Sequence, residues 1–286
     1  MDVALVSCRE LPEPDPDAAL LYQALTSAGF DTEVLAWDDP AVDWSRARLT
    51  VLRSTWNYPR HREAFLDWAE QTASASELWN PFPIVRWNTY KGYLLELERG
   101  GVPVVPTLLL PCGSTATLCG IREEHGWDVV VIKPAVSASS FKTRRIGPER
   151  LEAGETHLRE LLQERDVLVQ RYLTSVESYG ERALVWVDGE LTHAVRKSPR
   201  FEGDDESVSP VSVEISTPEA ALAQQALAAV RGPLLYARVD VAPGPDGQPL
   251  VMELELVEPS LFFSQCPRAL DRFVSGVRRR LDAAKS

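Results

Sequence analysis

Two late segments of the chain place charged side chains at every second position, a pattern that can hold a divalent cation. Asp240 follows Arg238 in the segment LLYARVDVA, and Glu253 and Glu255 lie in the segment VMELELVE. Strand residues alternate between the two faces of a sheet, so the charged side chains of each segment share one face. A hairpin turn at the intervening GPDG would place Asp240 opposite Glu253 and Arg238 opposite Glu255.

Like charges that face each other across two strands destabilise a sheet, so this arrangement calls for a compensating cation. Mg²⁺ takes carboxylate oxygens together with substrate phosphates, and an arginine such as Arg238 can hold a phosphate through two hydrogen bonds. The alternative is a solvated polar face with a local salt bridge. We therefore predict a magnesium site at Asp240, Glu253 and Glu255 that faces a phosphate-bearing ligand.

Lysines are rare in this chain, which favours arginine, and three of them lie at positions suited to a ligand. Lys133 ends the aliphatic run VVVIKP, where burial penalises a lone cation unless a phosphate or a carboxylate meets it. Lys91 lies early in a predicted helix, and Lys197 ends the segment HAVRK. For Lys91 and Lys197 a solvated surface charge is the alternative. We expect Lys133 to enter a cleft.

The small-residue segment VSASSFKT lies between two predicted strands and offers backbone N–H groups at Ser139 and Ser140. These groups can approach a phosphate, although an ordinary turn explains a loop without glycine equally well. The motifs GxxxxGK[ST], GxGxxG, HExxH and GxSxG do not occur in the sequence. Phosphate chemistry would therefore rely on dispersed basic residues, this loop and carboxylate-held magnesium.

Composition limits the partners and the location. The formal net charge is −12, so the surface repels nucleic acid and anionic membranes. No segment approaches ~18 consecutive apolar residues, and the N-terminal residues lack the pattern of a signal peptide. The cysteines are scattered without zinc spacing, which favours reduced thiols in a cytoplasmic protein. We expect neither a nucleic-acid nor a membrane partner.

Strands and helices alternate in the first part of the chain and predict a small parallel sheet. The predicted strands are 3–7, 32–36 and 49–53, and the predicted helices are 17–28 and 60–72. Ligands bind at the carboxyl ends of such strands, where the segment RSTWNYPR lies. Arg53 and Ser54 are therefore candidates for substrate contact, and a capped helix entry with a packed Trp56 is the alternative.

The rest of the chain predicts two mixed units. The first combines helices 88–101, 118–125 and 149–164 with strands 102–110, 129–134 and 167–173. The second contains two hairpins, 182–187 with 191–195 and 234–242 with 250–259, and helices 217–230 and 268–284. The acidic, aperiodic segment 201–212 predicts a mobile loop.

Taken in order, these motifs resemble the ATP-grasp superfamily. They are Lys91, Lys133-Pro134 with the small loop, QRYLTSVE, Gly180-Glu181, and Asp240 with Glu253-Leu-Glu255. The stretches LRSTWNY, VRWNTYKGYLLEL, VVIKPAVSASS, HAVRK and VMELELVEPSLFF are similar to those of the cycloserine-forming O-ureido-serine cyclo-ligase group. The resemblance covers nearly the whole chain. Glu255 stands where the superfamily commonly has Asn, which keeps an oxygen ligand and adds charge.

The resemblance implies an α/β (α+β) ATP-grasp fold in three parts. These are an N-terminal Rossmann-like domain at 1–86, a small lobe at 87–168, and a large lobe with the metal site at 169–286. It also implies how ATP is bound, with the phosphates at the two lysines, adenine at the segment from Gln170 and ribose at Glu177. The expected nucleotide contacts are Lys91, Lys133, Ser139, Ser140, Gln170, Arg171, Tyr172, Leu173, Glu177 and Glu181.

The implied reaction transfers the γ-phosphoryl group of ATP to a carboxylate, and a nitrogen nucleophile attacks the resulting acyl phosphate. Two Mg²⁺ ions would bridge the phosphates. Arg238, Arg196 and Lys197 are the expected catalytic residues, and Arg53, Ser54, Ser137 and Ser260 the expected substrate contacts. The partners would be a small carboxylate and an amine, and a homodimer is common for the fold. The alternatives are a peptide or amide ligase, a small-molecule kinase, and a non-catalytic nucleotide-binding protein.

Overall fold

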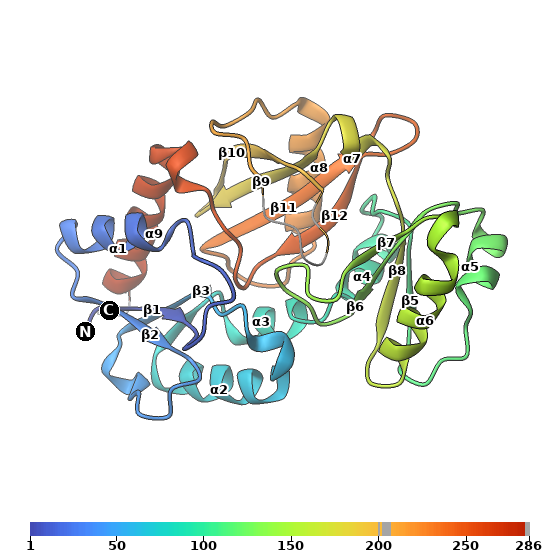
Figure 1. The fold of residues 1–286 in the computed structure, drawn as a ribbon. Helices are drawn as coiled ribbons and strands as arrows, with labels where there is room; N and C mark the ends of the chain where they lie inside the picture. The colour runs from blue at the N-terminus through green and yellow to red at the C-terminus, as the bar shows by residue number, and fades with distance from the viewer. Residues whose placement is uncertain (200, 202–206, 284–286) are drawn as a thin grey trace.

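The computed structural model describes residues 1–199, 201 and 207–283, and within them the strands form three four-stranded sheets (Figure 1). The first sheet belongs to the N-terminal unit. Its strands are β1 (Val3–Ser7), β2 (Thr32–Ala36), β3 (Leu49–Ser54) and β4 (Glu77–Trp79). They pair in the order β2-β1-β3-β4, and each pair is parallel. The predicted parallel sheet is therefore confirmed, with β4 as an additional edge strand.

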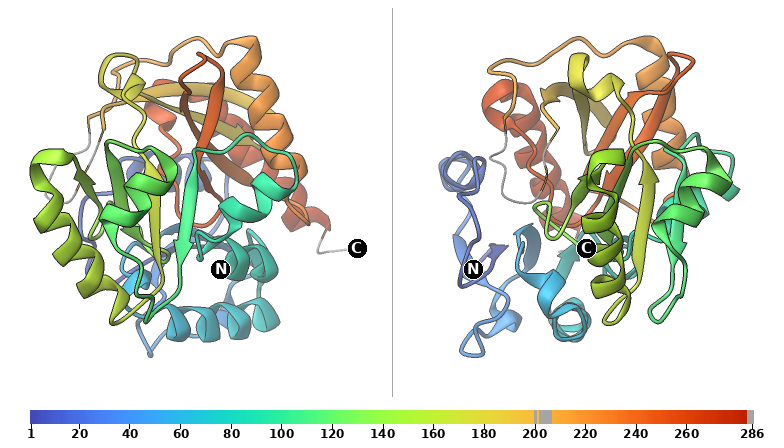
Figure 2. Two further views of the ribbon diagram at one scale, coloured as in Figure 1. Left: turned by 90° about the vertical axis from the view of Figure 1, so that its right-hand side faces the viewer. Right: turned by 45° about the vertical axis from the view of Figure 1, so that its right-hand side comes forward.

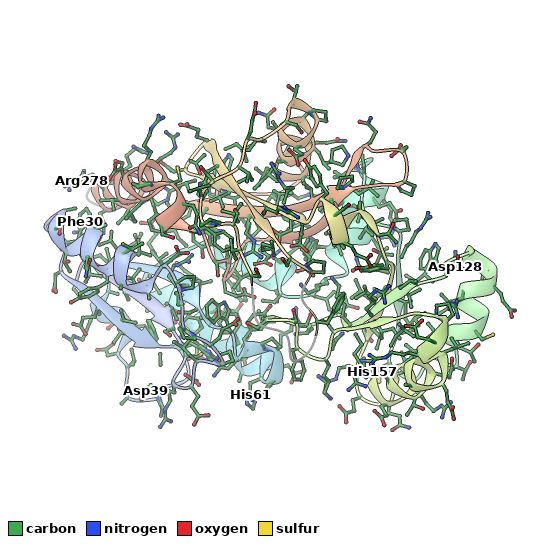
Figure 3. All side chains as sticks on the ribbon, turned by 45° about the horizontal axis from the view of Figure 1, so that its top comes forward. Phe30, Asp39, His61, Asp128, His157 and Arg278 are labelled. Atoms are coloured by element: carbon green, nitrogen blue, oxygen red, sulfur yellow. The ribbon has the colours of Figure 1, made fainter. Side chains whose placement is uncertain are left out.

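Helices cover this parallel sheet, and one of them comes from the far end of the chain. The helices are α1 (Ala18–Ser27), α2 (Arg62–Ala75), α3 (Phe82–Asn88) and α9 (Pro267–Ala283). Leu25 of α1 and Phe273 of α9 belong to one hydrophobic cluster. The Arg278 guanidinium lies 4.7 Å from the centre of the Phe30 ring, where α9 meets α1 (Figure 3). The terminal helix thus completes the core of the N-terminal unit.

The second sheet forms the small lobe. Its strands are β5 (Thr107–Leu110), β6 (Val130–Pro134), β7 (Arg144–Ile146) and β8 (Val167–Arg171). They pair antiparallel in the order β5-β8-β6-β7. The helices α5 (Leu118–His125) and α6 (Leu151–Leu162) lie together on one side of this sheet (Figure 2). The other side of the sheet is left to face the large lobe.

The third sheet forms the large lobe. Its strands are β9 (Glu181–Val187), β10 (Glu190–Lys197), β11 (Tyr236–Pro243) and β12 (Pro249–Glu255). They pair antiparallel in the order β10-β9-β11-β12, so both predicted hairpins are confirmed. The helix α8 (Thr217–Ala228) packs on β11 and β12, and α7 (Ser175–Ser178) is a single turn before β9. Ser216 and Glu219 form a reciprocal capping box that fixes the start of α8.

Short 3₁₀ turns complete the described structure, at η1 (Trp44–Arg46), η2 (Tyr58–Arg60), η3 (Pro148–Arg150) and η4 (Phe263–Gln265). None of the helices in the described ranges is long and apolar enough to cross a membrane. Residues 202–206 of the predicted mobile loop lie outside the described residues. The predicted boundary at 168/169 falls within β8, so that division of the chain stays a prediction.

The predicted helix 88–101 is wrong, because two shorter helices replace it. Phe82–Asn88 forms α3, which Pro81 and Pro83 start early, and Tyr93–Arg99 forms α4. Asn88 ends α3 by turning its amide to β12, where it accepts from the Leu256 N–H and donates to the Leu254 carbonyl. Lys91 therefore lies in the turn between α3 and α4, where its N–H donates to the Ala135 carbonyl.

The predicted strand 102–110 is shorter than expected, because only Thr107–Leu110 joins the small-lobe sheet. Pro103 and Pro106 lack the N–H that a continuous ladder needs. Val104 instead makes an isolated bridge to Val251 of β12. This segment consequently ties the small lobe to the large lobe before β5 begins.

A buried histidine on β10 predicts a specific acid sensitivity. His193 is 4% exposed, and burial lowers its pKa to about 4 from the ordinary 6.5. Between these values the unfolded chain binds a proton that the folded chain excludes, so stability falls as the pH falls from 6.5 to 4. In urea titrations the free energy of unfolding of the wild type should fall by on the order of 3 kcal/mol across this window. The free energy of unfolding of His193→Gln should fall less. An equal loss in both proteins would contradict this, and the exposed His125→Gln is the control.

Candidate active site

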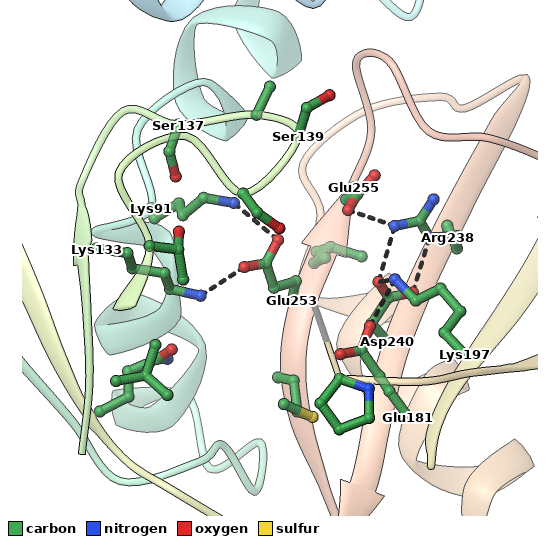
Figure 4. A pocket seen from close by; sticks show the side chains of 18 of the residues that line it. Lys91, Lys133, Ser137, Ser139, Glu181, Lys197, Arg238, Asp240, Glu253 and Glu255 are labelled. Atoms are coloured by element: carbon green, nitrogen blue, oxygen red, sulfur yellow. Dashed lines mark hydrogen bonds and ion pairs between the residues drawn. The ribbon is translucent and has the colours of Figure 1, made fainter. Parts of the chain in front are cut away.

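A pocket lies where the three units meet. It is lined by β6 and β8 of the small lobe, by β11 and β12 of the large lobe, and by the loop after β3 of the N-terminal unit. The small and large lobes therefore contribute strand residues to the pocket, and the N-terminal unit contributes loop residues. Figure 4 shows the centre of this pocket, with Lys91 and Lys133 on one side and the large-lobe acids, Arg238 and Lys197 on the other.

The predicted register of the acidic hairpin is confirmed. Asp240 on β11 pairs with Glu253 on β12, and Arg238 pairs with Glu255. All four residues line the pocket, so the charged face of the hairpin is turned inward. Asp240 is only 1% exposed. A shared buried face of this kind is unstable unless the acids meet cations.

Two lysines meet Glu253 from the opposite lobe (Figure 4). Lys91 Nζ lies 2.8 Å from one carboxylate oxygen, and Lys133 Nζ lies 2.5 Å from the other. Burial on its own would raise the pKa of Glu253, but the two ammonium groups hold that pKa well below its ordinary value. Glu253 therefore stays ionised and links the small lobe to the large lobe.

A second network surrounds Asp240. The Arg238 guanidinium approaches Asp240 with Nε at 2.8 Å, and Nη2 lies 2.5 Å from Glu255. Lys197 Nζ lies 2.8 Å from Asp240 and 2.6 Å from Glu181. Despite burial, Arg238 and Lys197 hold the pKa of Asp240 below its ordinary value, whereas burial raises the pKa of Glu181 to about 7. These bonds hold the side chains of Arg238 and Lys197, two predicted catalytic residues, side by side in the pocket.

The carboxylates suit magnesium in kind, although the described residues hold no preformed shell of three or more metal ligands. Asp240, Glu253 and Glu255 offer hard oxygen donors on adjacent positions of two paired strands. Each of them now binds a basic side chain. Mg²⁺ normally keeps substrate phosphates in its shell. The donor set therefore fits the ion in kind, and these three acids are the residues that would hold it.

The predicted adenine segment forms one end of the pocket. Gln170, Arg171, Tyr172 and Leu173 all line it, and the apolar side chain of Met252 lines it as well. Gln170 is held by a 2.9 Å hydrogen bond from its amide to the Thr107 hydroxyl on β5. This end of the pocket therefore combines the Gln170 amide and the Tyr172 ring with apolar side chains.

The small-residue loop between β6 and β7 also reaches the pocket. Ser137, Ser139 and Ser140 line it, and Ser139 and Ser140 have φ values of 47° and 55°. The Ser139 hydroxyl donates to Glu13 of the N-terminal unit at 2.8 Å. The loop thus adopts left-handed backbone geometry without glycine, and a polar contact holds it over the pocket.

Four predicted site residues lie outside the pocket lining. Arg53 is buried behind it, where Nη2 donates to the Pro259 carbonyl at 2.9 Å, and Ser54 faces Ser7. Glu177 lies beside Arg145, and exposed Arg196 donates to the Ser178 carbonyl. Side chains of successive strand residues alternate faces, which sends Arg196 away from the side where Lys197 lies. Arg53 supports the pocket wall instead of touching its contents.

Other lining residues were not predicted. Trp56 and Tyr58 project from the loop after β3, Glu258 follows β12, and Glu13 comes from the N-terminal unit. The segment RSTWNYPR was flagged as a ligand loop, and this contained the signal for both aromatics. Glu258 lies beyond the alternating run of β12, and Glu13 lies in an irregular acidic segment. Neither acid stands in a periodic pattern that sequence analysis can use.

Comparison with known proteins identifies the architecture. Residues 3–80 match the family model of the N-terminal domain of D-cycloserine synthetase DcsG. The cycloserine biosynthesis protein DcsG of Streptomyces lavendulae is 33% identical, over 93% of this chain and 94% of that protein. The chain belongs to the DcsG family of ATP-grasp ligases. It is accordingly an ATP-dependent ligase that forms C–N bonds.

Solved structures agree with this assignment. The crystal structure of D-cycloserine synthetase DcsG matches with a TM-score of 0.88 and 32% identity, over 98% of this chain and all of that one. An ATP-grasp RimK domain protein from Sphaerobacter thermophilus matches with a TM-score of 0.71 and 22% identity, over 99% of this chain and 98% of its own. The second likeness is one of fold. The predicted ATP-grasp architecture is therefore confirmed.

The lysine pair yields a binding prediction. Lys133→Met removes one ammonium group from the pocket but keeps the length of the side chain. Because Lys133 is 6% exposed and lines the pocket, we expect ADP affinity in the presence of Mg²⁺ to fall at least ~10-fold, on the scale of a lost charge-assisted bond. Isothermal titration calorimetry measures this change. Lys142→Met, in the same lobe but outside the lining, is the control, and wild-type affinity in Lys133→Met would refute the contact.

Proposed function

We propose that this ligase activates the carboxylate of a small amino-acid derivative as an acyl phosphate, which a nitrogen nucleophile then attacks. An O-ureido-serine, whose own ureido nitrogen closes a ring, is the substrate that we favour. The observation that carries the proposal is the inward-facing hairpin Asp240–Glu253 with Lys91 and Lys133 opposite it. The full-length relationship to a cycloserine biosynthesis protein supports the choice of substrate.

We assign ATP to the cleft between the small and large lobes. The base would lie at Gln170 to Leu173, and the phosphates would draw Lys91 and Lys133 away from Glu253. Asp240, Glu253 and Glu255 would then hold Mg²⁺, with two ions as the favoured number. Bound Mg²⁺ supplies neutralisation of the phosphate charge, which is what phosphoryl transfer chiefly needs.

The chain's own residues would orient the two reacting groups. Arg238 and Lys197 lie beside Asp240, where they can attract the substrate carboxylate and stabilise charge on the transferred phosphoryl group. The Ser139 loop and the Trp56 loop border the same space and would exclude water from an acyl phosphate. Arg53, Ser54, Glu177 and Arg196 take no part in this assignment.

Turnover should depend on the two facing carboxylates. Asp240→Asn and Glu253→Gln keep side-chain size but remove charge, and each should lower turnover at least ~100-fold because phosphate charge loses its metal-mediated stabilisation. Coupled ADP-release assays measure the rate, and circular dichroism checks the fold. Asp246→Asn, in the turn that joins the same two strands, should retain wild-type turnover. Wild-type rates in Asp240→Asn or Glu253→Gln would remove the metal assignment.

Isotope transfer tests the acyl phosphate itself. With O-ureido-D-serine or O-ureido-L-serine labelled with ¹⁸O in the carboxylate, ligation should move one label into inorganic phosphate, together with formation of the cyclised product. Mass spectrometry follows both. Phosphate retained on an organic product would instead show a kinase, and a two-substrate product with added amino acids would show a peptide-type ligase. Absence of ADP formation with every substrate would reject catalysis of this kind.

A further inference from the structure

One acid of the pocket differs in its surroundings from the acids on the large-lobe strands. Glu181, Asp240, Glu253 and Glu255 each form an ion pair with a basic side chain. Glu258 lines the same pocket, yet among the described residues no basic side chain forms an ion pair with it. Its side chain instead meets the Tyr58 hydroxyl. The described part of the protein therefore does not neutralise Glu258 with an ion pair.

Aromatic rings border this carboxyl group. Trp56 and Tyr58 come from the loop after β3, and both line the pocket beside the segment that carries Glu258 and Ser260. The Tyr58 hydroxyl donates to the Glu258 carboxyl, with Tyr58 buried and Glu258 half-buried. A carboxylate next to aromatic faces is a common arrangement for binding an ammonium group, because ring faces also attract cations.

Side chains of the N-terminal unit hold the backbone of the segment that carries Glu258. Trp56 Nε1 donates to the Glu258 carbonyl at 2.9 Å, and Arg53 donates to the Pro259 carbonyl. The Asp17 carboxylate accepts the backbone N–H groups of Leu261, Phe262 and Phe263, at 2.6, 3.1 and 2.8 Å. The carboxyl group is thus mounted on a fixed backbone, and a ligand would not have to order it first.

We propose that Glu258 binds the ammonium group of an amino-acid substrate, with Tyr58 orienting the carboxylate and Trp56 bordering the cation. This inference rests on the proposed function, which places the substrate in this pocket. It narrows the substrate class to carboxylic acids that also carry a protonated amine. The ammonium would lie at Glu258, and the substrate carboxylate would lie toward Arg238.

Burial makes the charge state of Glu258 depend on an arriving cation. Desolvation, together with the negative charge of Glu255, raises the pKa of Glu258 to about 8. An arriving ammonium favours the ionised form and forms a charge-assisted hydrogen bond away from water. A neutral analogue of the same shape gains neither interaction. Discrimination against des-amino compounds is the measurable consequence.

The test compares matched ligands on protein loaded with ADP and Mg²⁺. The probes are O-ureidoserine, as the D and L forms, and 3-(ureidooxy)propanoic acid, which lacks the amino group. By titration calorimetry the wild type should bind at least one amino form ~30-fold more tightly than the des-amino form, the ratio that removal of a buried charge partner typically produces. In Glu258→Gln this ratio should fall below ~3-fold, while ADP affinity stays unchanged.

Further variants separate recognition from support of the fold. Tyr58→Phe keeps the ring and should reduce the ratio only partly. Glu258→Asp keeps the charge and should retain a preference for the amino form, which provides the readout if Glu258→Gln does not fold. Asp246→Asn removes an acid from the turn between β11 and β12, outside the pocket lining, and should leave the ratio at the wild-type value.

Three results would overturn the inference. They are equal binding of amino and des-amino probes by the wild type, a full preference retained in Glu258→Gln, and loss of the preference in Asp246→Asn alone. Failure of the proposed function gives a different signature. An ammonium preference that depends on Glu258, without ¹⁸O transfer from the carboxylate to phosphate, would keep this inference and reject the ligase mechanism.

Discussion

The structure of the site depends on the pairing of β11 with β12, which places acids opposite one another on a buried face. Such a face is stable only if cations meet it, and Arg238 on the same face is joined by lysines from elsewhere in the fold. Lys91 and Lys133 reach Glu253 from the small-lobe side of the cleft, whereas Lys197 reaches Asp240 from β10 of the same sheet. Glu253 therefore makes an electrostatic contact between the two lobes, in addition to the ion pair of Arg145 with Glu177. A triphosphate that attracts the lysines would exchange this contact for one through the ligand, so ATP binding and the relation of the two lobes are physically coupled.

The N-terminal unit contributes by supporting the wall of the pocket. Asp17 accepts three backbone N–H groups after Ser260, and Arg53 lies 3.6 Å from Asp17 while it donates to the Pro259 carbonyl. Burial raises the pKa of Asp17, and Arg53 with the backbone donors opposes this rise. The buried pair shapes the turn in which Phe262 takes a φ of 51°. A polar motif at a strand end can thus support a pocket through the backbone that it holds.

The sequence predicted the parts of the site that local periodicity controls. The register of Asp240 with Glu253 follows from two alternating runs and one Asp-Gly turn, and both are local. The helix predicted around Lys91 was wrong, because the Asn88 amide bonds to the backbone at the end of β12 and ends α3. This is a tertiary contact that local sequence does not reveal. Arg53 was assigned to substrate because strand ends often meet ligands, but which way a strand-end side chain turns depends on partners such as Asp17. Glu258 follows the periodic run, so no pattern marked it before the chain was folded.

The charges of the pocket support one further step of argument. In the ligand-free arrangement Lys91, Lys133, Lys197 and Arg238 meet Glu181, Asp240, Glu253 and Glu255, so bases and acids are matched in number. Magnesium with a triphosphate would preserve this balance, because metal ions replace the lysines at the carboxylates and phosphates receive the lysines. Glu258 lines the same pocket, and among the described residues no basic side chain forms an ion pair with it. A zwitterionic amino acid would supply such a partner, since its carboxylate suits Arg238 and its ammonium suits Glu258. In this proposal the acid without an ion pair sets the charge pattern of the second substrate.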